Sequence, residues 1–130
     1  YSFLAAGREG LIAGEYVRDE PAGRLIELRR PHGADEATVA ASLAASVTPG
    51  IPRMQGAALV DGRWFVSAST GNAPGDLWVG EPGHLVRHAG VLPPGPEDLA
   101  FEPGTRMLWT LSEHPRRRWV LAVDADAWAR

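Results

Sequence analysis

The chain has 130 residues, a mass of 13.9 kDa and a net charge of −3 at pH 7, with a sequence pI near 5.8. A chain of this length normally folds as one domain, and its acidic balance argues against general nucleic-acid binding, which needs surplus basic charge. Cysteine is absent, which excludes a disulfide framework and a thiolate metal site, and no apolar run is long enough to predict a membrane span.

The first part of the chain predicts short strands. Leu11–Gly14 and Arg24–Leu28 are apolar runs separated by glycine, proline and aspartate, which are turn residues. The next segment has two interpretations. Asp35–Ala45 is rich in alanine and begins with acids, which favours a short helix, whereas Thr38–Val47 suits a fourth strand equally well. Thr48–Pro52 then predicts an extended connector, because proline disfavours helix in the residue before it.

The middle of the chain predicts four strands, near Gly56–Val60, Trp64–Ser69, Leu77–Gly80 and Leu85–His88. Asp61-Gly62 between the first two is a strong hairpin signal, because glycine accepts the positive φ that a tight turn demands.

The last part predicts three strands, at Asp98–Phe101, Met107–Ser112 and Trp119–Asp124. Pro103-Gly104-Thr105 takes the place of the Asp61-Gly62 turn and is one residue longer. The chain stops where a fourth strand would begin. We expect that strand from the other end of the chain, another segment or another subunit.

The middle and last parts of the sequence align with each other as a repeat. Gln55 aligns with Glu97, 42 positions later, and Leu59 aligns with Phe101. When one residue is inserted in the later copy, Arg63–Ser67 aligns with Arg106–Thr110. A period of this length with several short strands per copy is typical of propeller blades. We therefore predict an all-β, β-propeller-type segment of about three four-stranded antiparallel sheets.

The three predicted blades cover residues 1–50, 51–92 and 93–130, and together form one domain, 1–130. Propellers carry ~4–8 blades, so we expect this segment to belong to a larger or oligomeric propeller. Its partner would be the remainder of a longer propeller chain or another subunit. Four tryptophans recur in the second and third strands of their copies: Trp64, Trp78, Trp109 and Trp119. At these positions large flat side chains would pack between neighbouring sheets.

One string, Gly95–Pro103, resembles the segment that opens a blade in propellers of the gluconolactonase and strictosidine-synthase-like class. The resemblance covers this GPEDLAFEP corner and, by pattern, two blades. In metal-dependent members an acid at such a corner faces the central tunnel and binds calcium. The resemblance therefore implies Glu97 as a metal ligand, with Asp98 beside it. The alternative is a structural role, in which Glu97 accepts hydrogen bonds from backbone N–H groups at a tight corner.

Other polar residues are candidates for ligand binding. The innermost strands of a propeller converge on its axis, so polar side chains at the start of these strands lie close together. Arg53, Gln55, Glu97 and Glu113 are our candidate ligand-binding residues. Arg53 counts against calcium, since its charge repels a cation and calcium needs ~6–8 oxygen ligands.

Two residues are candidates for acid–base chemistry. His114 follows a predicted strand end and would act as a general base if Glu97 or Glu113 oriented it, and Asp98 is the second candidate. An exposed turn histidine is the competing interpretation of His114.

Our functional prediction is a non-catalytic binding or scaffold propeller that recognises a small molecule or a protein at its tunnel mouth and loops. The alternative is a calcium-dependent lactonase or hydrolase. The sequence carries no G-x-S-x-G, P-loop, G-x-G-x-x-G or H-E-x-x-H motif. The lack of cysteine leaves the compartment open, and an extracellular, secreted protein is the favoured assignment.

Overall fold

A computed structural model describes residues 2–7, 10–19, 23–29, 43–47, 49–81, 83–116 and 118–128. Within these ranges the chain is all-β, with strands in three antiparallel sheets and one short 3-10 turn, η1 (Ala125–Ala127). None of these residues belongs to a helix that is long and apolar enough to cross a membrane. The all-β prediction is therefore confirmed.

Each sheet is a meander, in which strands that follow one another in the chain pair side by side. The first sheet contains β1 (Phe3–Ala6), β2 (Gly10–Gly14), β3 (Leu25–Arg29) and β4 (Leu43–Val47). The second contains β5 (Met54–Val60), β6 (Arg63–Thr70), β7 (Ala73–Glu81) and β8 (His84–Pro94). The third contains β9 (Pro96–Glu102), β10 (Met107–Ser112) and β11 (Val120–Asp124).

The segment that the sequence predicted as either a helix or a fourth strand is a strand where the structure describes it. β4 covers Leu43–Val47 and pairs with β3. A helix over Asp35–Ala45 is therefore wrong at its last three residues, and the rest of that segment lies outside the described residues.

The two comparable hairpins differ in loop length. Asp61 and Gly62 both have positive φ, 49° and 82°, as a two-residue type I′ turn requires, and they join Val60 to Arg63. The loop from β9 to β10 has four residues and ends at Arg106, with φ 56°. The third copy therefore carries two inserted residues in this loop rather than one.

The additional residue in the β9–β10 loop changes which positions of the second and third sheets are equivalent. Leu59 pairs with Trp64 in the second sheet, and Phe101 pairs with Leu108 in the third. Trp64 therefore corresponds to Leu108, and Phe65 corresponds to Trp109. The predicted superposition of Trp64 on Met107 is wrong by one residue.

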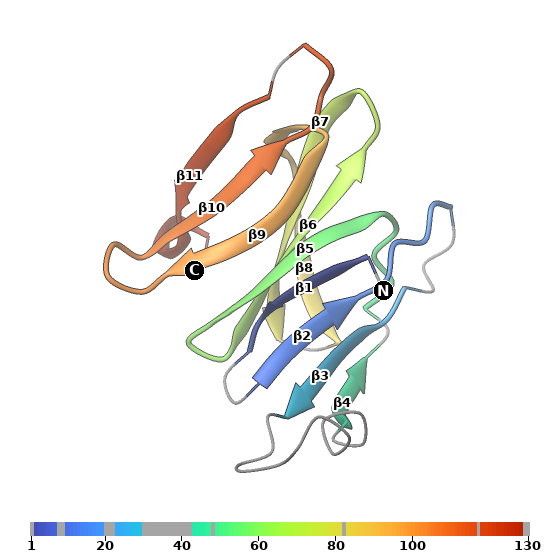
Figure 1. Cartoon of the computed structure of the whole chain (residues 1–130), viewed down its shortest axis with the longest axis vertical. Coiled ribbons are helices and arrows are strands. Elements are labelled where there is room, and N and C mark those ends of the chain that lie inside the picture. Colours follow the sequence, from blue (N-terminus) through green and yellow to red (C-terminus); the bar gives the residue numbers. More distant parts are fainter. Residues whose placement is uncertain are drawn as a thin grey trace.

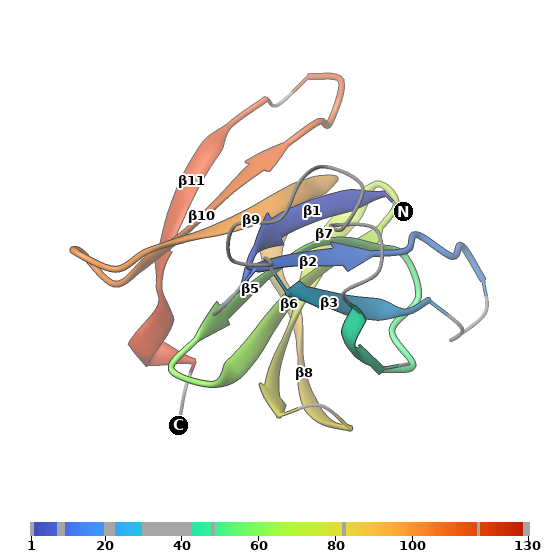
Figure 2. The ribbon, with the colours of Figure 1, turned by 60° about the horizontal axis from the view of Figure 1, so that its bottom comes forward.

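The three sheets radiate from their first strands (Figures 1 and 2). β5 packs against both β1 and β9, so the first strand of each sheet lies at the centre. The second sheet is sandwiched between the other two. The described strands form no closed barrel or ring.

The two cores lie on opposite faces of the second sheet. We call the face of a sheet that points toward the next sheet in the chain its forward face, and the opposite face its rear face. The first core joins the forward face of the first sheet to the rear face of the second, and its buried strand residues are Phe3, Ile12, Leu25, Met54, Ala57, Trp64, Val66 and Ala68. The second core joins the forward face of the second sheet to the rear face of the third, and its buried strand residues are Ala58, Val60, Phe65, Leu77, Val79, Leu92, Leu99 and Leu108.

The tryptophans divide between covered and exposed surfaces. Trp64 is buried in the first core, and Trp78 packs against it. Trp109 and Trp119 are exposed, by 41% and 46%. The prediction of packing between sheets is confirmed for the first two, and it stays a prediction for the last two, which are exposed in this chain. Trp109 lies on the forward face of the third sheet, which no described residue of another sheet covers.

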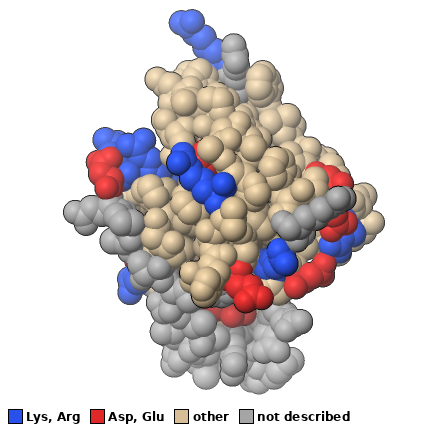
Figure 3. Space-filling view, turned by 180° about the vertical axis from the view of Figure 1, so that it is seen from behind, with Lys and Arg blue, Asp and Glu red and all other residues tan. Residues whose placement is uncertain are grey.

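Charged side chains show no large region of one sign on the face seen in Figure 3, where acidic and basic residues lie beside one another. Two ion pairs of this kind are Arg53–Asp19 and Arg106–Asp126. This interspersed charge agrees with the small net charge of −3.

Candidate functional site

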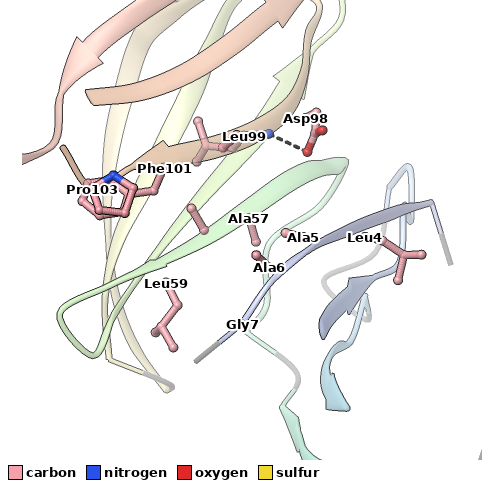
Figure 4. Close-up of a pocket in the computed structure, with 12 residues that line it drawn as sticks. Leu4, Ala5, Ala6, Gly7, Ala57, Leu59, Asp98, Leu99, Phe101 and Pro103 are labelled. Atoms are coloured by element: carbon pink, nitrogen blue, oxygen red, sulfur yellow. Dashed lines mark hydrogen bonds between the residues drawn. The ribbon is translucent and has the colours of Figure 1, made fainter. Parts of the chain in front are cut away.

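An apolar groove lies where the first strands of the three sheets meet (Figure 4). β1, β5 and β9 line it, and its volume is about 380 Å³. Its lining is mostly small or apolar: Leu4, Ala5, Ala6, Gly7, Ala57, Ala58, Leu59, Leu99, Ala100, Phe101 and Pro103, with Asp98 as the single charged residue. A groove of this size falls within the range of small-molecule pockets, about 300–1,000 Å³.

The groove depends on a close crossing of β5 and β9. A Cβ added at Gly56 would lie 2.3 Å from the carbonyl carbon of Asp98 and 2.4 Å from the nitrogen of Leu99. Only glycine allows two backbones to approach this closely. Asp98 has a φ of 47° at this point, and its Oδ1 accepts a hydrogen bond from the Leu99 N–H at 2.7 Å. Asp98 is thereby fixed at one end of the groove, with Pro103 at the other (Figure 4).

The polar corner at the entry of β9 joins two of the predicted site residues directly. The Gln55 Nε2 donates a hydrogen bond to the Glu97 Oε1 at 3.1 Å. The pKa of Glu97 is raised above its ordinary value, first because partial burial disfavours the charged form, and then because Glu113 and Asp98 add negative charge nearby. Gln55 and Glu97 thus meet between two sheets, as their equivalent positions predicted.

The end of β10 brings Glu113 and His114 to the same corner. The Glu113 N–H donates to the Gly95 carbonyl oxygen at 2.9 Å, and the His114 N–H donates to the Ser112 Oγ at 3.3 Å. The His114 Nδ1 is buried and has no hydrogen-bond partner. No carboxylate orients the imidazole through that nitrogen, so the geometry expected of a carboxylate-oriented general base is missing there.

Arg53 does not join this corner. Its Nε donates to the Arg18 carbonyl oxygen at 2.8 Å, and its guanidinium pairs with Asp19 at 3.1 Å. It lines a different cavity, between the segment that follows β2 and the second sheet, with Asp76 and Trp78 among the other lining residues. Its φ of 56° is the local feature that turns the chain into β5.

The described residues contain no group of three or more His, Cys, Asp or Glu side chains that could hold a metal ion. Glu113 and Asp98 are near enough to influence Glu97 electrostatically, but the Glu97 carboxylate accepts from Gln55, and the Asp98 carboxylate accepts from the Leu99 N–H. The calcium assignment of Glu97 stays a prediction.

The sequence alone did not identify the groove. Its walls are alanines and leucines, which have no chemical signature, and only their position on first strands brings them together. The pair Ala57-Ala58 directly after Gly56 is the signal that was available, since a run of small residues marks a strand that another backbone approaches closely.

Comparison with known proteins adds no relative. No family model matches the chain, and no curated protein or solved structure matches it.

Proposed function

We propose that this chain is a segment of a β-propeller that acts as a non-catalytic binding or scaffold module, and that its ligand is a small, largely apolar molecule held in the groove between β1, β5 and β9. The observation that carries the proposal is the groove itself. Three meander sheets radiate from first strands that enclose about 380 Å³ of mostly apolar space. In a propeller this position is the central channel.

The chemistry of the groove favours binding over catalysis. Burial of apolar ligand surface supplies affinity, and the carboxylate of Asp98 at one end would favour a ligand that carries a hydrogen-bond donor or a positive charge there. His114, the other acid–base candidate, does not line the groove.

Titration with the neutral apolar dye Nile red tests this function. We expect the dye to bind and its fluorescence to rise on transfer to the apolar groove. Ala6→Trp, which fills the groove from an exposed lining position, should weaken binding by about tenfold or more, equivalent to ~1.4 kcal/mol. Ala89→Trp places the same side chain at an exposed position of β8 and should leave binding unchanged.

Dye could also bind the exposed apolar face of the third sheet, so Trp109→Glu is the second control. Binding that survives Trp109→Glu and fails with Ala6→Trp supports the groove. Binding that is equal in Ala6→Trp and the wild type, or that is lost with Trp109→Glu, overturns the proposal.

The alternative function, a calcium-dependent lactonase or hydrolase, draws on the acidic corner formed by Glu97, Asp98 and Glu113. A ligand that binds the native state raises the melting temperature by mass action. Calcium should therefore raise it in the wild type, and not in Glu97→Gln, if the alternative is correct. Under the proposed binding function, calcium leaves the melting temperature of both proteins unchanged.

A further inference from the structure

The two junctions between sheets are built the same way. Ile12 on the forward face of the first sheet packs in one core with Trp64 on the rear face of the second. Phe65 on the forward face of the second sheet packs in one core with Leu108 on the rear face of the third. A forward face therefore meets a rear face both times, chiefly through the strands nearest the centre.

The forward face of the third sheet has the same apolar character but is exposed. Trp109 corresponds to the buried Phe65, and Val120 corresponds to the buried Leu77, because Phe65 pairs with Ala58 and Trp109 with Ala100 in the same register. Trp109, Leu111 and Val120 are exposed by 41%, 41% and 72%. They line one shallow hollow of about 120 Å³ together with Ala100. A contiguous exposed apolar patch of this kind marks an interaction site.

The rear face of the first sheet is the complementary free surface. Leu11 corresponds to Trp64, because Ala6 pairs with Leu11 as Leu59 pairs with Trp64. Leu4 and Leu11 are exposed by 60% and 46%. Ala13 on β2 and Ile26 on β3 lie on the same face and are buried, so the free part lies on β1 and at the Leu11 end of β2. These are the counterparts of β5 and β6, which supply most of the second sheet's covered rear face.

We propose that a second copy of this chain covers the forward face of the third sheet with the rear face of its first sheet, and that two copies joined in this way close one ring. The proposal rests on the proposed propeller and adds its partner. The chain itself presents both halves of the junction that it already makes twice internally. Two copies supply six sheets, within the ~4–8 of known propellers, whereas three copies would exceed that range.

Each junction joins different surfaces of the two copies, and a twofold axis relates the two junctions, so the pair is a closed C2 dimer. It therefore differs from a face-to-face dimer, in which the third sheets of two copies would meet each other. The difference can be tested with variants of exposed residues, which are expected to leave the fold of each chain intact.

Sedimentation velocity and light scattering of the 130-residue chain are the primary measurements. We expect the mass of two chains. Val120→Glu places a charge on the forward face of the third sheet, and Leu11→Glu places one on the rear face of the first sheet. Each variant alone should run as a monomer, because each spoils both junctions of the ring. Val86→Glu, an equally simple change at an exposed position of β8, should remain a dimer.

Mixing the two monomeric variants gives the sharpest readout. The intact forward face of Leu11→Glu and the intact rear face of Val120→Glu can form one junction, so the mixture should regain a two-chain species. A face-to-face dimer predicts the opposite, since Leu11→Glu would then dimerise alone and mixing would rescue nothing. Circular dichroism of each variant checks that it is folded.

A wild-type monomer, a dimer that survives Leu11→Glu, growth into open polymers, or a mixture that stays monomeric each overturns the proposal. Nile red binding, read in the same samples, separates this proposal from the proposed function. A monomer that binds the dye in the groove overturns only the pairing. A dimer that does not bind the dye overturns only the ligand-binding function.

Discussion

The second and third sheets are built alike but are covered differently. The second has four strands and a neighbour on each face, whereas the third has three described strands and a neighbour on one face. Phe65 is fully buried and its counterpart Trp109 is 41% exposed. The third sheet nevertheless keeps large apolar residues on its open face. Its sequence therefore fits a covered environment, although the described residues of the chain do not provide one.

The largest effect expected from this comparison is at the pair Phe65 and Trp109. Phe65→Ala removes a fully buried ring and should lower the free energy of unfolding by about 3–5 kcal/mol, because a cavity remains in the core. Trp109→Ala should cost no more than about 1 kcal/mol in the monomer, where the side chain is already partly in water. Chemical denaturation at low protein concentration measures both. Equal losses would mean that the two faces are not distinguished by burial.

The crossing of β5 and β9 gives the next effect, because it ties the second sheet to the third. Gly56→Ala puts a methyl group 2.3 Å from the Asp98 carbonyl carbon, so one backbone must move. We expect a loss of about 1–3 kcal/mol, the usual cost of overpacking, and weaker dye binding in the adjoining groove. Gly104→Ala is the matched control, since nothing lies within 4 Å of its added Cβ and its φ is not positive. A stable Gly56→Ala protein would contradict the close approach.

A smaller effect concerns β8, the fourth strand of the second sheet, which has no described counterpart in the third sheet. Asp76 on β7 is buried, and its carboxylate accepts from the Arg87 Nε at 2.7 Å and from the Gly90 N–H at 2.9 Å, both on β8. Asp76→Ala should cost about 1–2 kcal/mol, because hydrogen bonds to a charged acceptor are lost. Faster amide exchange in β8 would localise the loss.

Asp19→Ala is the control for that measurement. Asp19 also pairs with an arginine, Arg53, at 3.1 Å, but its side chain is 71% exposed. Exposed pairs contribute about 0–1 kcal/mol, so this variant should unfold almost as the wild type does. A loss as large as that of Asp76→Ala would remove the role given to burial.

Local sequence signals predicted most of the strands, although not β1, because strand and turn chemistry is local. Asp61-Gly62 predicted one hairpin, and apolar runs bounded by turn residues predicted β5, β6 and β10. The sequence did not reveal which face of the third sheet Trp109 occupies, because one extra loop residue exchanges the two faces of a strand. Gln55 and Glu97 were paired by the repeat. Arg53 was misplaced because its ion pair with Asp19, far away in the sequence, drew it toward the first sheet.

The smallest expected effect is at the entry corner, where the two sheets exchange a side-chain hydrogen bond. The pKa of Glu97 is raised above its ordinary 4.5, chiefly by burial and then by Glu113 and Asp98. The folded protein therefore holds this proton more tightly than the unfolded chain. The stability that this provides is complete below the ordinary pKa and is lost as the pH rises through the folded value.

Glu97→Gln removes the loss of stability that accompanies ionisation of Glu97, and it keeps an oxygen that can accept a hydrogen bond from the Gln55 Nε2. We expect the variant to be more stable than the wild type at neutral pH by under about 1 kcal/mol, a small gain because solvent reaches the corner. The advantage should disappear below about pH 4, where the wild-type carboxyl is itself neutral. Denaturant midpoints of both proteins across this pH range measure it, with Glu81→Gln as an exposed control. A variant that is less stable at neutral pH would mean that the charge of Glu97 is stabilised by something other than Gln55, as a bound cation would do.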